Sequence, residues 1–192
     1  MLEITQDGEL HQFCESCGAE ALDETRAGGK TSYRCRACGA VLPRAIIIDP
    51  GVVWWSGEDW TYWHESAGVL IRDDDHRILF FERTKYPPGI TVPAGHVDRG
   101  EHHRETALRE AREEVSVVLE SVHLIAEADI ANDSCRRGSD HHRWHLYEGS
   151  MPANGNVVVT DEGHRPVWLA REEALERPLI VPVRWFLERM DE

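Results

Sequence analysis

Apolar residues recur at helical spacing between residues 103 and 115. This stretch contains neither Gly nor Pro and consists mostly of residues that favour helices. At roughly 100° per residue, Ala107, Ala111 and Val115 fall on one side of such a helix, and Leu108 borders them. The pattern therefore predicts a helix over about residues 103–115 that packs one face against a hydrophobic core.

Acidic residues gather beside this predicted apolar face. Glu110, Glu113 and Glu114 share an arc that is roughly 100° wide at helical spacing. Because like charges repel, a solvated helix face usually mixes both signs, and the arginines of the same segment would then be their partners. Grouped carboxylates also suit Mg²⁺ or Mn²⁺, which prefer hard oxygen ligands. The pattern allows either a charged surface helix or a metal site.

The residues that precede and accompany the predicted helix are compatible with the metal. Residues 91–95 read as a short strand that ends in small residues, so their backbone carbonyls can approach the same ion. Glu101 lies near the start of the helix, where the helix dipole favours an anion. Arg109 is placed to pair with a carboxylate and to fix its orientation.

Four of the five cysteines lie before residue 40, in two Cys-x-x-Cys-Gly units. Two thiolates at this spacing can bind one ion, and the following Gly allows the tight turn beneath it. Disulfides are the rival interpretation, but we find no export signal, and a cytoplasm keeps thiols reduced. The spacing predicts one structural zinc ion bound by Cys14, Cys17, Cys35 and Cys38. The fifth, Cys135, is given no role.

The charge of the chain limits its partners. The 192 residues include 21 basic and 35 acidic ones, a formal net charge of −14, which argues against duplex nucleic acid as a partner. Small phosphorylated substrates need only a local basic pocket, particularly where metal ions add positive charge. The longest strongly apolar run, residues 45–48, is too short to span a bilayer, and the amino terminus lacks a signal sequence. We therefore expect a soluble, cytoplasmic protein that does not bind membranes.

Residues 95–117 resemble the Nudix box, whose pattern is Gly-x5-Glu-x7-Arg-Glu-U-x-Glu-Glu-x-Gly-U with U aliphatic. The positions that match this pattern are Gly95, Glu101, Arg109, Glu110, Ala111, Glu113, Glu114 and Val117. Ser116 stands where the family has Gly, a residue that ends the helix in a left-handed turn, and Ser adopts that conformation at a cost of about 1 kcal/mol. The substitution therefore affects local stability, while every carboxylate position is intact.

The resemblance implies a fold and a domain layout. Residues 62–72 and 77–83 resemble the first two strands of the family, and residues 121–130, 142–150 and 166–169 read as further strands. The family fold is an α/β sandwich of the α/β/α type with a mixed sheet. We expect a zinc ribbon at residues 1–44, a Trp-rich lead-in at 45–61 and the Nudix domain at 62–192. The lead-in is also where we would look for the partner surface of a homodimer.

The resemblance also implies a reaction, which is hydrolysis of a nucleoside diphosphate linked to another group, X. Glu110, Glu113 and Glu114 would bind catalytic Mg²⁺ or Mn²⁺, and the Ala94 carbonyl is a further ligand candidate. Several Nudix enzymes carry another glutamate on a loop, and Glu162 matches that place. Either Glu114 or Glu162 would accept the proton from the attacking water. Gly95, Glu101 and Arg109 would shape and orient the site.

The residues that could bind the substrate follow from weaker sequence patterns. Arg83, at the end of a predicted strand, and Lys85, on the loop after it, are placed to bind a phosphate. Arg143 and His145 alternate along the predicted strand 142–150, which fits a side that faces the substrate pocket. We do not interpret the histidines of this strand as a second metal site.

The order of a zinc ribbon and a Nudix domain resembles that of NADH pyrophosphatases. Their Ser-Gln-Pro-Trp-Pro-Phe-Pro run after the box has no counterpart in residues 118–150. NAD(H), ADP-ribose and dinucleoside polyphosphates therefore remain competing substrates. A different class also stays open, in which the ribbon contacts RNA or protein and a non-catalytic Nudix fold senses a ligand. The intact carboxylates favour the enzyme.

Overall fold

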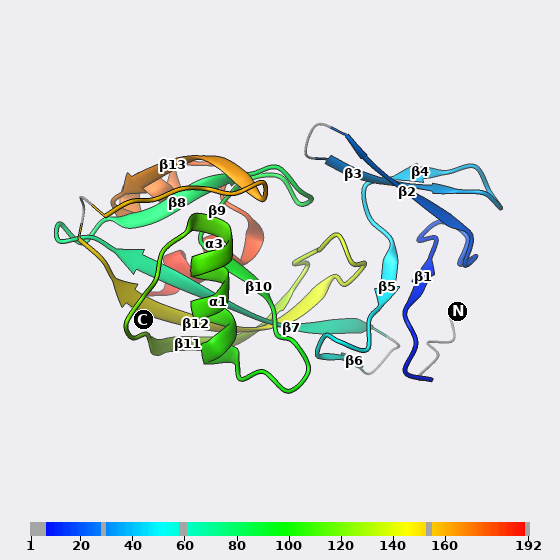
Figure 1. The fold of residues 1–192 in the computed structure, drawn as a ribbon, viewed down its shortest axis with the longest axis horizontal. Helices are drawn as coiled ribbons and strands as arrows, with labels where there is room; N and C mark the ends of the chain where they lie inside the picture. Colours follow the sequence, from blue (N-terminus) through cyan, green and yellow to red (C-terminus); the bar gives the residue numbers. More distant parts are fainter. Residues whose placement is uncertain (1–6, 28–29, 58–60, 153–154, 191–192) are drawn as a thin grey trace.

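The protein consists of a small N-terminal part and a larger part built around one sheet (Figure 1). The computed structural model describes residues 7–27, 30–57, 61–152 and 155–190. Trp60 of the predicted lead-in therefore lies outside the described residues. Among the described residues, no helix is both long enough and apolar enough to cross a membrane.

The larger part contains an eight-stranded mixed sheet. Its central strands follow the order β11-β12-β7-β8-β13, while β6 and β10 pair with β7, and β9 pairs with β8. Strands β7 and β12 are parallel, and the other pairs are antiparallel. The strands are β6 (Trp54–Ser56), β7 (Tyr62–Arg72), β8 (Ile78–Arg83), β9 (Ile90–Thr91), β10 (Ala94–His96), β11 (His123–Ala131), β12 (His141–Ser150) and β13 (Gly163–Leu169).

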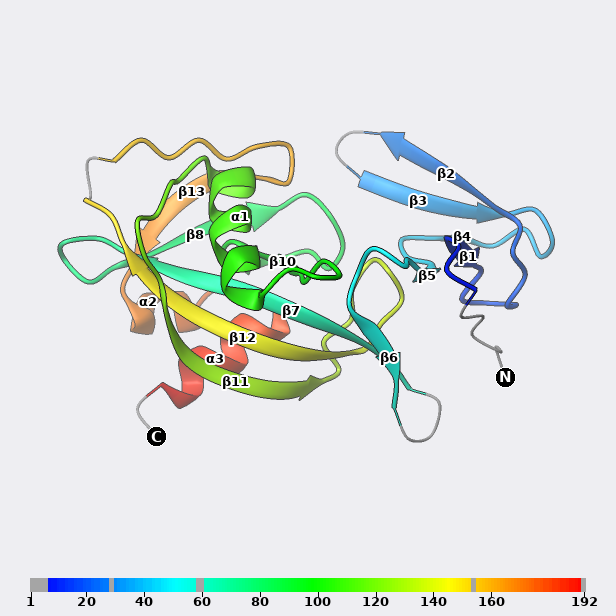
Figure 2. The same cartoon turned by 60° about the horizontal axis from the view of Figure 1, so that its bottom comes forward.

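Helices cover both faces of this sheet (Figure 2). Helix α1 (His103–Val115) lies on one face, and α2 (Arg171–Leu175) and α3 (Val181–Arg189) lie on the other. Because successive side chains of a strand point to opposite faces of the sheet, the hydrophobic core is divided into two clusters, one on each face. Leu79 and Phe81 of β8 pack on the side of α1, whereas Ile78 and Phe80 pack on the side of α3. The predicted α/β/α sandwich with a mixed sheet is confirmed.

Most predicted elements of the sandwich agree closely with the structure. Helix α1 has the predicted bounds, and its buried residues include the three predicted on the apolar face, Ala107, Ala111 and Val115. Strand β7 also has its predicted bounds. Residues 91–95 differ from the prediction, because they are split between β9 and β10 instead of forming one strand. The separating residues include Pro93, which has no N–H to donate to a ladder.

The N-terminal part holds two small sheets. Their strands are β1 (His11–Phe13) paired with β5 (Ile46–Ile48), and β2 (Leu22–Ala27), β3 (Lys30–Cys35) and β4 (Val41–Leu42) in one three-stranded sheet. Phe13 and Ile48 pack with Tyr62 of β7, and Trp54 of the lead-in packs against this cluster. This cluster thus joins the two parts of the chain through Ile48 and Trp54 of the lead-in.

A loop of the larger part also contacts the N-terminal part. The β11–β12 loop, residues 132–140, accepts backbone hydrogen bonds from Ala45 and Ile47 at its Arg136 and Arg137 carbonyls, at 3.2 and 3.0 Å. Arg44 is buried and forms ion pairs of 2.9 Å with Glu15 and 2.7 Å with Asp140. The β11–β12 loop therefore links the two parts of the chain.

Helix α1 ends in the left-handed turn that the family pattern implies. Ser116 adopts φ 59° and ψ 26°, and its N–H donates to the Ala111 and Arg112 carbonyls. Gly takes this conformation without the steric cost of a Cβ. We expect Ser116→Gly to raise the free energy of unfolding by about 0.5–1 kcal/mol. Urea denaturation measures the gain, and Ser116→Ala, which keeps the Cβ, should show none. A destabilised glycine variant would contradict this explanation.

Candidate active site

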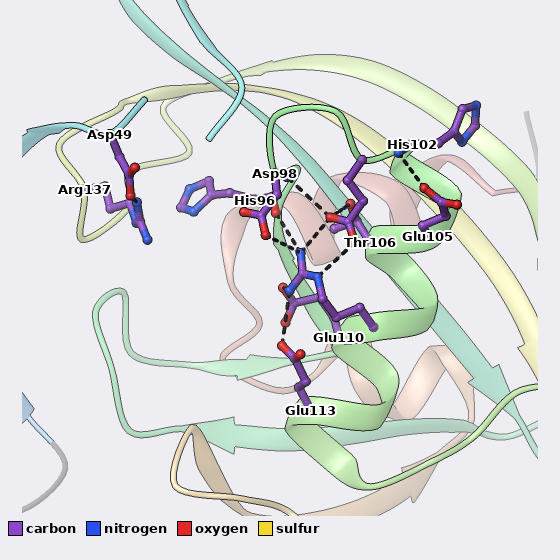
Figure 3. A network of polar contacts seen from close by, with 11 residues as sticks. Asp49, His96, Asp98, His102, Glu105, Thr106, Glu110, Glu113 and Arg137 are labelled. Carbon is purple, nitrogen blue, oxygen red and sulfur yellow. Dashed lines mark hydrogen bonds and ion pairs between the residues drawn. The ribbon is translucent and has the colours of Figure 1, made fainter. Parts of the chain in front are cut away.

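The acidic face of α1 borders a cavity between the sheet and the loops at its edge. Glu110 and Glu113 lie one turn apart and project from the same side of the helix (Figure 3). The helix begins with a capping box, in which Glu105 accepts from the His102 N–H at 3.0 Å. This well-defined start fixes the position of the glutamates along the helix axis.

Arg109 connects the carboxylates to one another. Its guanidinium donates to both oxygens of Glu101 at 3.0 Å and to Glu110 at 2.6 Å. It also donates to Glu113 at 3.2 Å and to the His96 carbonyl at 3.2 Å. One rigid cation thus sets the positions of three carboxylates and of strand β10. The sequence predicted that Arg109 pairs with a carboxylate but not which one, and in the structure its partners are Glu101, Glu110 and Glu113.

Glu114 and Gly95 lie at the deepest part of this arrangement. Glu114 is buried, and its Oε2 accepts from the Ala94 N–H at 2.9 Å. A Cβ on Gly95 would lie 1.9 Å from Glu110 Oε1, so a larger residue here would push this carboxylate out of its position. The glycine of the box therefore makes room for a carboxylate.

The buried carboxylates resist ionisation. Burial raises the pKa of Glu110, although the neighbouring Arg109 opposes the shift. Burial and the adjacent charge of Glu110 raise the pKa of Glu114 to about 8. The site thus concentrates more negative charge than its own arginine can balance. A bound cation would stabilise both ionised forms.

A cavity of about 250 Å³ brings these glutamates together with basic residues. Arg83, Lys85, Ala94 and Glu162 all contribute to its lining. Glu162 reaches it on the loop before β13, and its carboxylate forms an ion pair with Lys85. The sequence proposed these two residues separately and did not predict that they pair.

Backbone contacts hold the Glu162 loop in place. The Thr84 N–H donates to the Glu162 carbonyl at 3.1 Å, and the Thr160 N–H donates to the Glu114 carbonyl at 3.0 Å. The loop is therefore attached both to the end of β8 and to the end of α1. This explains how a residue 48 positions after Glu114 reaches the same cavity.

Arg143 lies elsewhere. It forms a bidentate ion pair with Asp129, at 2.8 and 2.9 Å, and its guanidinium lies 5.5 Å from the Trp55 ring centroid. It lines a separate groove with Glu65 and His145. The structure does not bring Arg143 to the cavity of the α1 carboxylates.

The four N-terminal cysteines converge. The Sγ atoms of Cys14 and Cys38 are 3.8 Å apart, and those of Cys17 and Cys35 are 3.7 Å apart. Zn–S bonds of about 2.3 Å place the sulfurs of a tetrahedral site roughly 3.8 Å apart. Gly18 and Gly39, at φ 72° and 78°, donate to the carbonyls of Cys14 and Cys35. The two predicted turns are thus alike, and the four thiols fit one metal ion.

The sequence did not predict a second cluster, made of His64, His96, Cys135 and His142. Their ligand atoms lie within 4.8 Å of one another. Burial opposes ionisation of Cys135, but hydrogen bonds from the three imidazoles hold the pKa of its thiol well below the usual value. The four residues come from separate segments, so no sequence spacing within one segment predicts the cluster.

The matches to known proteins agree with this fold and site. The NUDIX domain model matches residues 62–189, and the chain belongs to this family. One relative, the NAD-capped RNA hydrolase NudC of Stutzerimonas stutzeri, is 31% identical over 118 residues. This match covers 60% of the chain but only 35% of the relative's length.

Solved structures show the same fold. The MutT protein of Methanosarcina mazei Go1 superposes with a TM-score of 0.58 at 20% identity, covering 67% of this chain and 93% of that one. The NUDIX domain of Shewanella oneidensis NrtR, solved with ADP ribose, has a TM-score of 0.57 at 16% identity. This second match covers 70% of the chain and 90% of the NrtR domain chain.

Proposed function

We propose that this chain is a Nudix pyrophosphohydrolase that uses Mg²⁺ or Mn²⁺ to cleave a nucleoside diphosphate linked to X. Residues 62–192 would form the catalytic domain, preceded by the ribbon at 1–44 and the linker at 45–61. The observation that carries the proposal is the cavity in which Glu110 and Glu114 face Arg83 and Lys85. It joins a cation site to groups that bind phosphate.

The donor set fits a hard divalent cation. Glu110, Glu113 and Glu114 would hold it, with Ala94 as a further ligand through its carbonyl. Burial raises the pKa of Glu110 and Glu114, so the free site lacks the positive charge that such a cation provides. When bound, Mg²⁺ or Mn²⁺ supplies neutralising charge to the phosphates and acidifies a water.

The other residues of the cavity supply positioning and proton transfer. Arg83 and Lys85 would bind the phosphates, which sets the scissile linkage above the α1 carboxylates. Arg109 keeps the carboxylates in one arrangement through its contacts with Glu101, Glu110 and Glu113. Glu114 and Glu162 are the two carboxylates proposed to accept the proton of the attacking water.

The names of the relatives suggest substrates with which to test the proposal. The NudC relative is named as a hydrolase of NAD-capped RNA, and the NrtR domain was solved with ADP ribose. A panel of NAD(H), ADP-ribose, dinucleoside polyphosphates and NAD-capped RNA, with products identified by mass spectrometry, tests the proposal. Mononucleotide products formed only with Mg²⁺ or Mn²⁺ are expected. Tight binding of a ligand without any turnover would instead support a sensor.

Lys85→Met should weaken substrate binding. Loss of the charge that faces the phosphates is expected to raise KM by roughly tenfold, equivalent to about 1.4 kcal/mol. Steady-state kinetics at saturating Mg²⁺ measure the change. Arg165→Met is a matched control, because Arg165 is exposed and its nearest carboxylate is Glu82, at 3.3 Å. An unchanged KM in Lys85→Met would remove Lys85 from the substrate site.

We also propose that Cys14, Cys17, Cys35 and Cys38 bind one structural zinc ion. Four protein thiolates leave no coordination position for water, so this ion would stabilise the N-terminal part without taking part in hydrolysis. Cys35→Ser with Cys38→Ser should lower the zinc content by one ion per chain and lower the thermal stability of the ribbon. Elemental analysis and thermal denaturation measure the two effects. Zinc content equal to that of the parent would disprove this site.

A further inference from the structure

The His–Cys cluster, made of His64, His96, Cys135 and His142, forms one wall of the proposed catalytic cavity, whose lining includes His96, Cys135 and His142. His64 belongs to β7, His96 to β10 and His142 to β12, while Cys135 lies on the β11–β12 loop. His64 and His142 are almost completely buried, with 1% and 2% of their surfaces exposed. All four side chains therefore converge from separate segments, and His96 and Cys135 are only partly buried because they border the cavity.

The distances within the cluster suit a tetrahedral metal. Zinc bonds of about 2.0–2.3 Å place nitrogen and sulfur ligands roughly 3.3–3.8 Å apart. Cys135 Sγ lies 3.5 Å from His64 Nδ1, and the four ligand atoms lie within 4.8 Å of one another. The upper limit of 4.8 Å exceeds the separation in a tetrahedral site by about 1 Å, so binding would draw the four ligand atoms together.

Neighbouring residues orient a nitrogen lone pair of His64 toward the centre. The Tyr62 hydroxyl donates to the Ile47 carbonyl at 2.7 Å, and the same oxygen lies 2.7 Å from His64 Nε2. Because the single hydroxyl proton is used, Nε2 must be the donor in its contact with Tyr62. Nδ1 of neutral His64 is then unprotonated, and it faces Cys135.

A carboxylate also lies beside His142. His142 Nδ1 lies 3.2 Å from Asp133 Oδ2, which also accepts from Trp144 Nε1 at 2.7 Å. The contact at Nδ1 has the distance of an ion pair but not the geometry of a hydrogen bond, and Nε2 is the other ring nitrogen that can bind a metal. A buried carboxylate behind a histidine is the usual arrangement around protein-bound zinc. Asp133 is 5% exposed, so it is held in place within the protein interior.

We propose that His64, His96, Cys135 and His142 form a second zinc site, distinct from the N-terminal cysteines and from the Mg²⁺ or Mn²⁺ site. Three imidazoles and one thiolate are the donors that zinc prefers, whereas Mg²⁺ and Mn²⁺ prefer oxygen. Four protein ligands close the coordination shell, so the ion serves to hold segments together.

A second group, made of His103, Glu127 and His145, lines the groove of Arg143 and is a poorer metal site. His145 has Glu65 2.8 Å from Nε2 and Glu127 2.6 Å from Nδ1. Both ring nitrogens therefore lie close to carboxylates, and Nε2 forms a hydrogen bond with Glu65. This group also offers three donors, one fewer than the His–Cys cluster. His103 stacks on His145 at 3.8 Å with an interplanar angle of 5°, which directs the two rings parallel to each other. The His–Cys cluster is the better metal site.

The zinc site would connect the active site to the N-terminal part. His96 directly follows Gly95, and its carbonyl accepts from Arg109 at 3.2 Å. Cys135 lies on the same loop that bonds Ala45 and Ile47 through its Arg136 and Arg137 carbonyls. One ion would thus hold strand β10 and the β11–β12 loop in fixed positions beside the α1 carboxylates.

Zinc counting on the full chain tests this proposal. The chain is purified without a metal-binding tag and dialysed against excess Mg²⁺, which displaces ions held weakly by the carboxylates. We expect two zinc ions per chain in the parent, one in Cys135→Ser and one in His142→Gln. The Cys35→Ser, Cys38→Ser variant should also retain one, which isolates the second site. One zinc in the parent, or an unchanged count in Cys135→Ser, would overturn the proposal.

Thiol modification of the parent protein gives a readout that needs no variant to fold. Iodoacetamide labelling followed by peptide mass mapping reports Cys135 separately from the other four cysteines. With zinc bound, Cys135 should react slowly, and its labelling rate should rise at least tenfold after chelation. Rapid labelling before chelation would mean a free, reactive thiolate and would rule out the metal.

Discussion

Glu114→Gln is expected to reduce the rate of metal-dependent hydrolysis by roughly a thousandfold. The substitution preserves size and keeps an oxygen that can accept from the Ala94 N–H, a bond of 2.9 Å in the parent. It removes a charge from the proposed cation site and a proton acceptor from the cavity. The variant should therefore fold normally but should hydrolyse the substrate much more slowly. Glu113→Gln is expected to have a similar effect, because Glu113 lies on the same acidic face.

The measurement is kcat/KM across a range of Mg²⁺ concentrations. Loss of a metal ligand should also raise the Mg²⁺ concentration needed for half-maximal activity. Glu105→Gln on the same helix is a matched control, since its side chain caps the helix start and a glutamine oxygen can accept the same N–H. Hydrolysis at the parent rate in Glu113→Gln and Glu114→Gln would show that these glutamates are not the ligands.

Features of the sandwich that follow local rules were predictable from the sequence. Helix α1 has its predicted bounds because its apolar spacing, its helix-forming residues and the absence of Gly and Pro all agree. The left-handed turn at Ser116 was also foreseen from the family pattern. The same periodicity placed Glu110, Glu113 and Glu114 beside the apolar face. Glu110 and Glu114 lie there with raised pKa values, whereas the Glu113 side chain is 52% exposed.

Features that depend on long-range contacts were not predictable. Lys85 and Glu162 pair across 77 positions of sequence, because a loop joined to β8 and α1 brings them together. Likewise His64 and His142 meet only because β7 and β12 are adjacent parallel strands, in which these two residues are register partners. The same register places Arg143 opposite Glu65, away from the carboxylate cavity. Sequence spacing carries no information about such pairings without the sheet order.

Arg109→Met is expected to lower the free energy of unfolding by about 2–3 kcal/mol at pH 7, less than for a fully buried pair because Arg109 is partly exposed. The side chain keeps its length, but Glu101 and Glu110 lose their counter-charge, and their carboxylates are only 17% and 12% exposed. Arg109→Lys should recover part of the loss, since a lysine ammonium restores the charge but not the bidentate contact. Urea denaturation measures all three proteins.

The pH dependence of this loss separates charge from packing. Burial alone would raise the pKa of Glu101, but hydrogen bonds from Arg109 and Thr106 hold its pKa below the usual value. A depressed pKa stabilises the fold above the unfolded pKa of about 4.3, and the effect is lost as the pH falls through the folded pKa. The stability difference between parent and Arg109→Met should therefore be complete at pH 7 and should shrink below about pH 4. A difference that stays constant over this range would mean that Arg109 stabilises the helix through its hydrocarbon stem, and the orienting role proposed for its charge would be wrong.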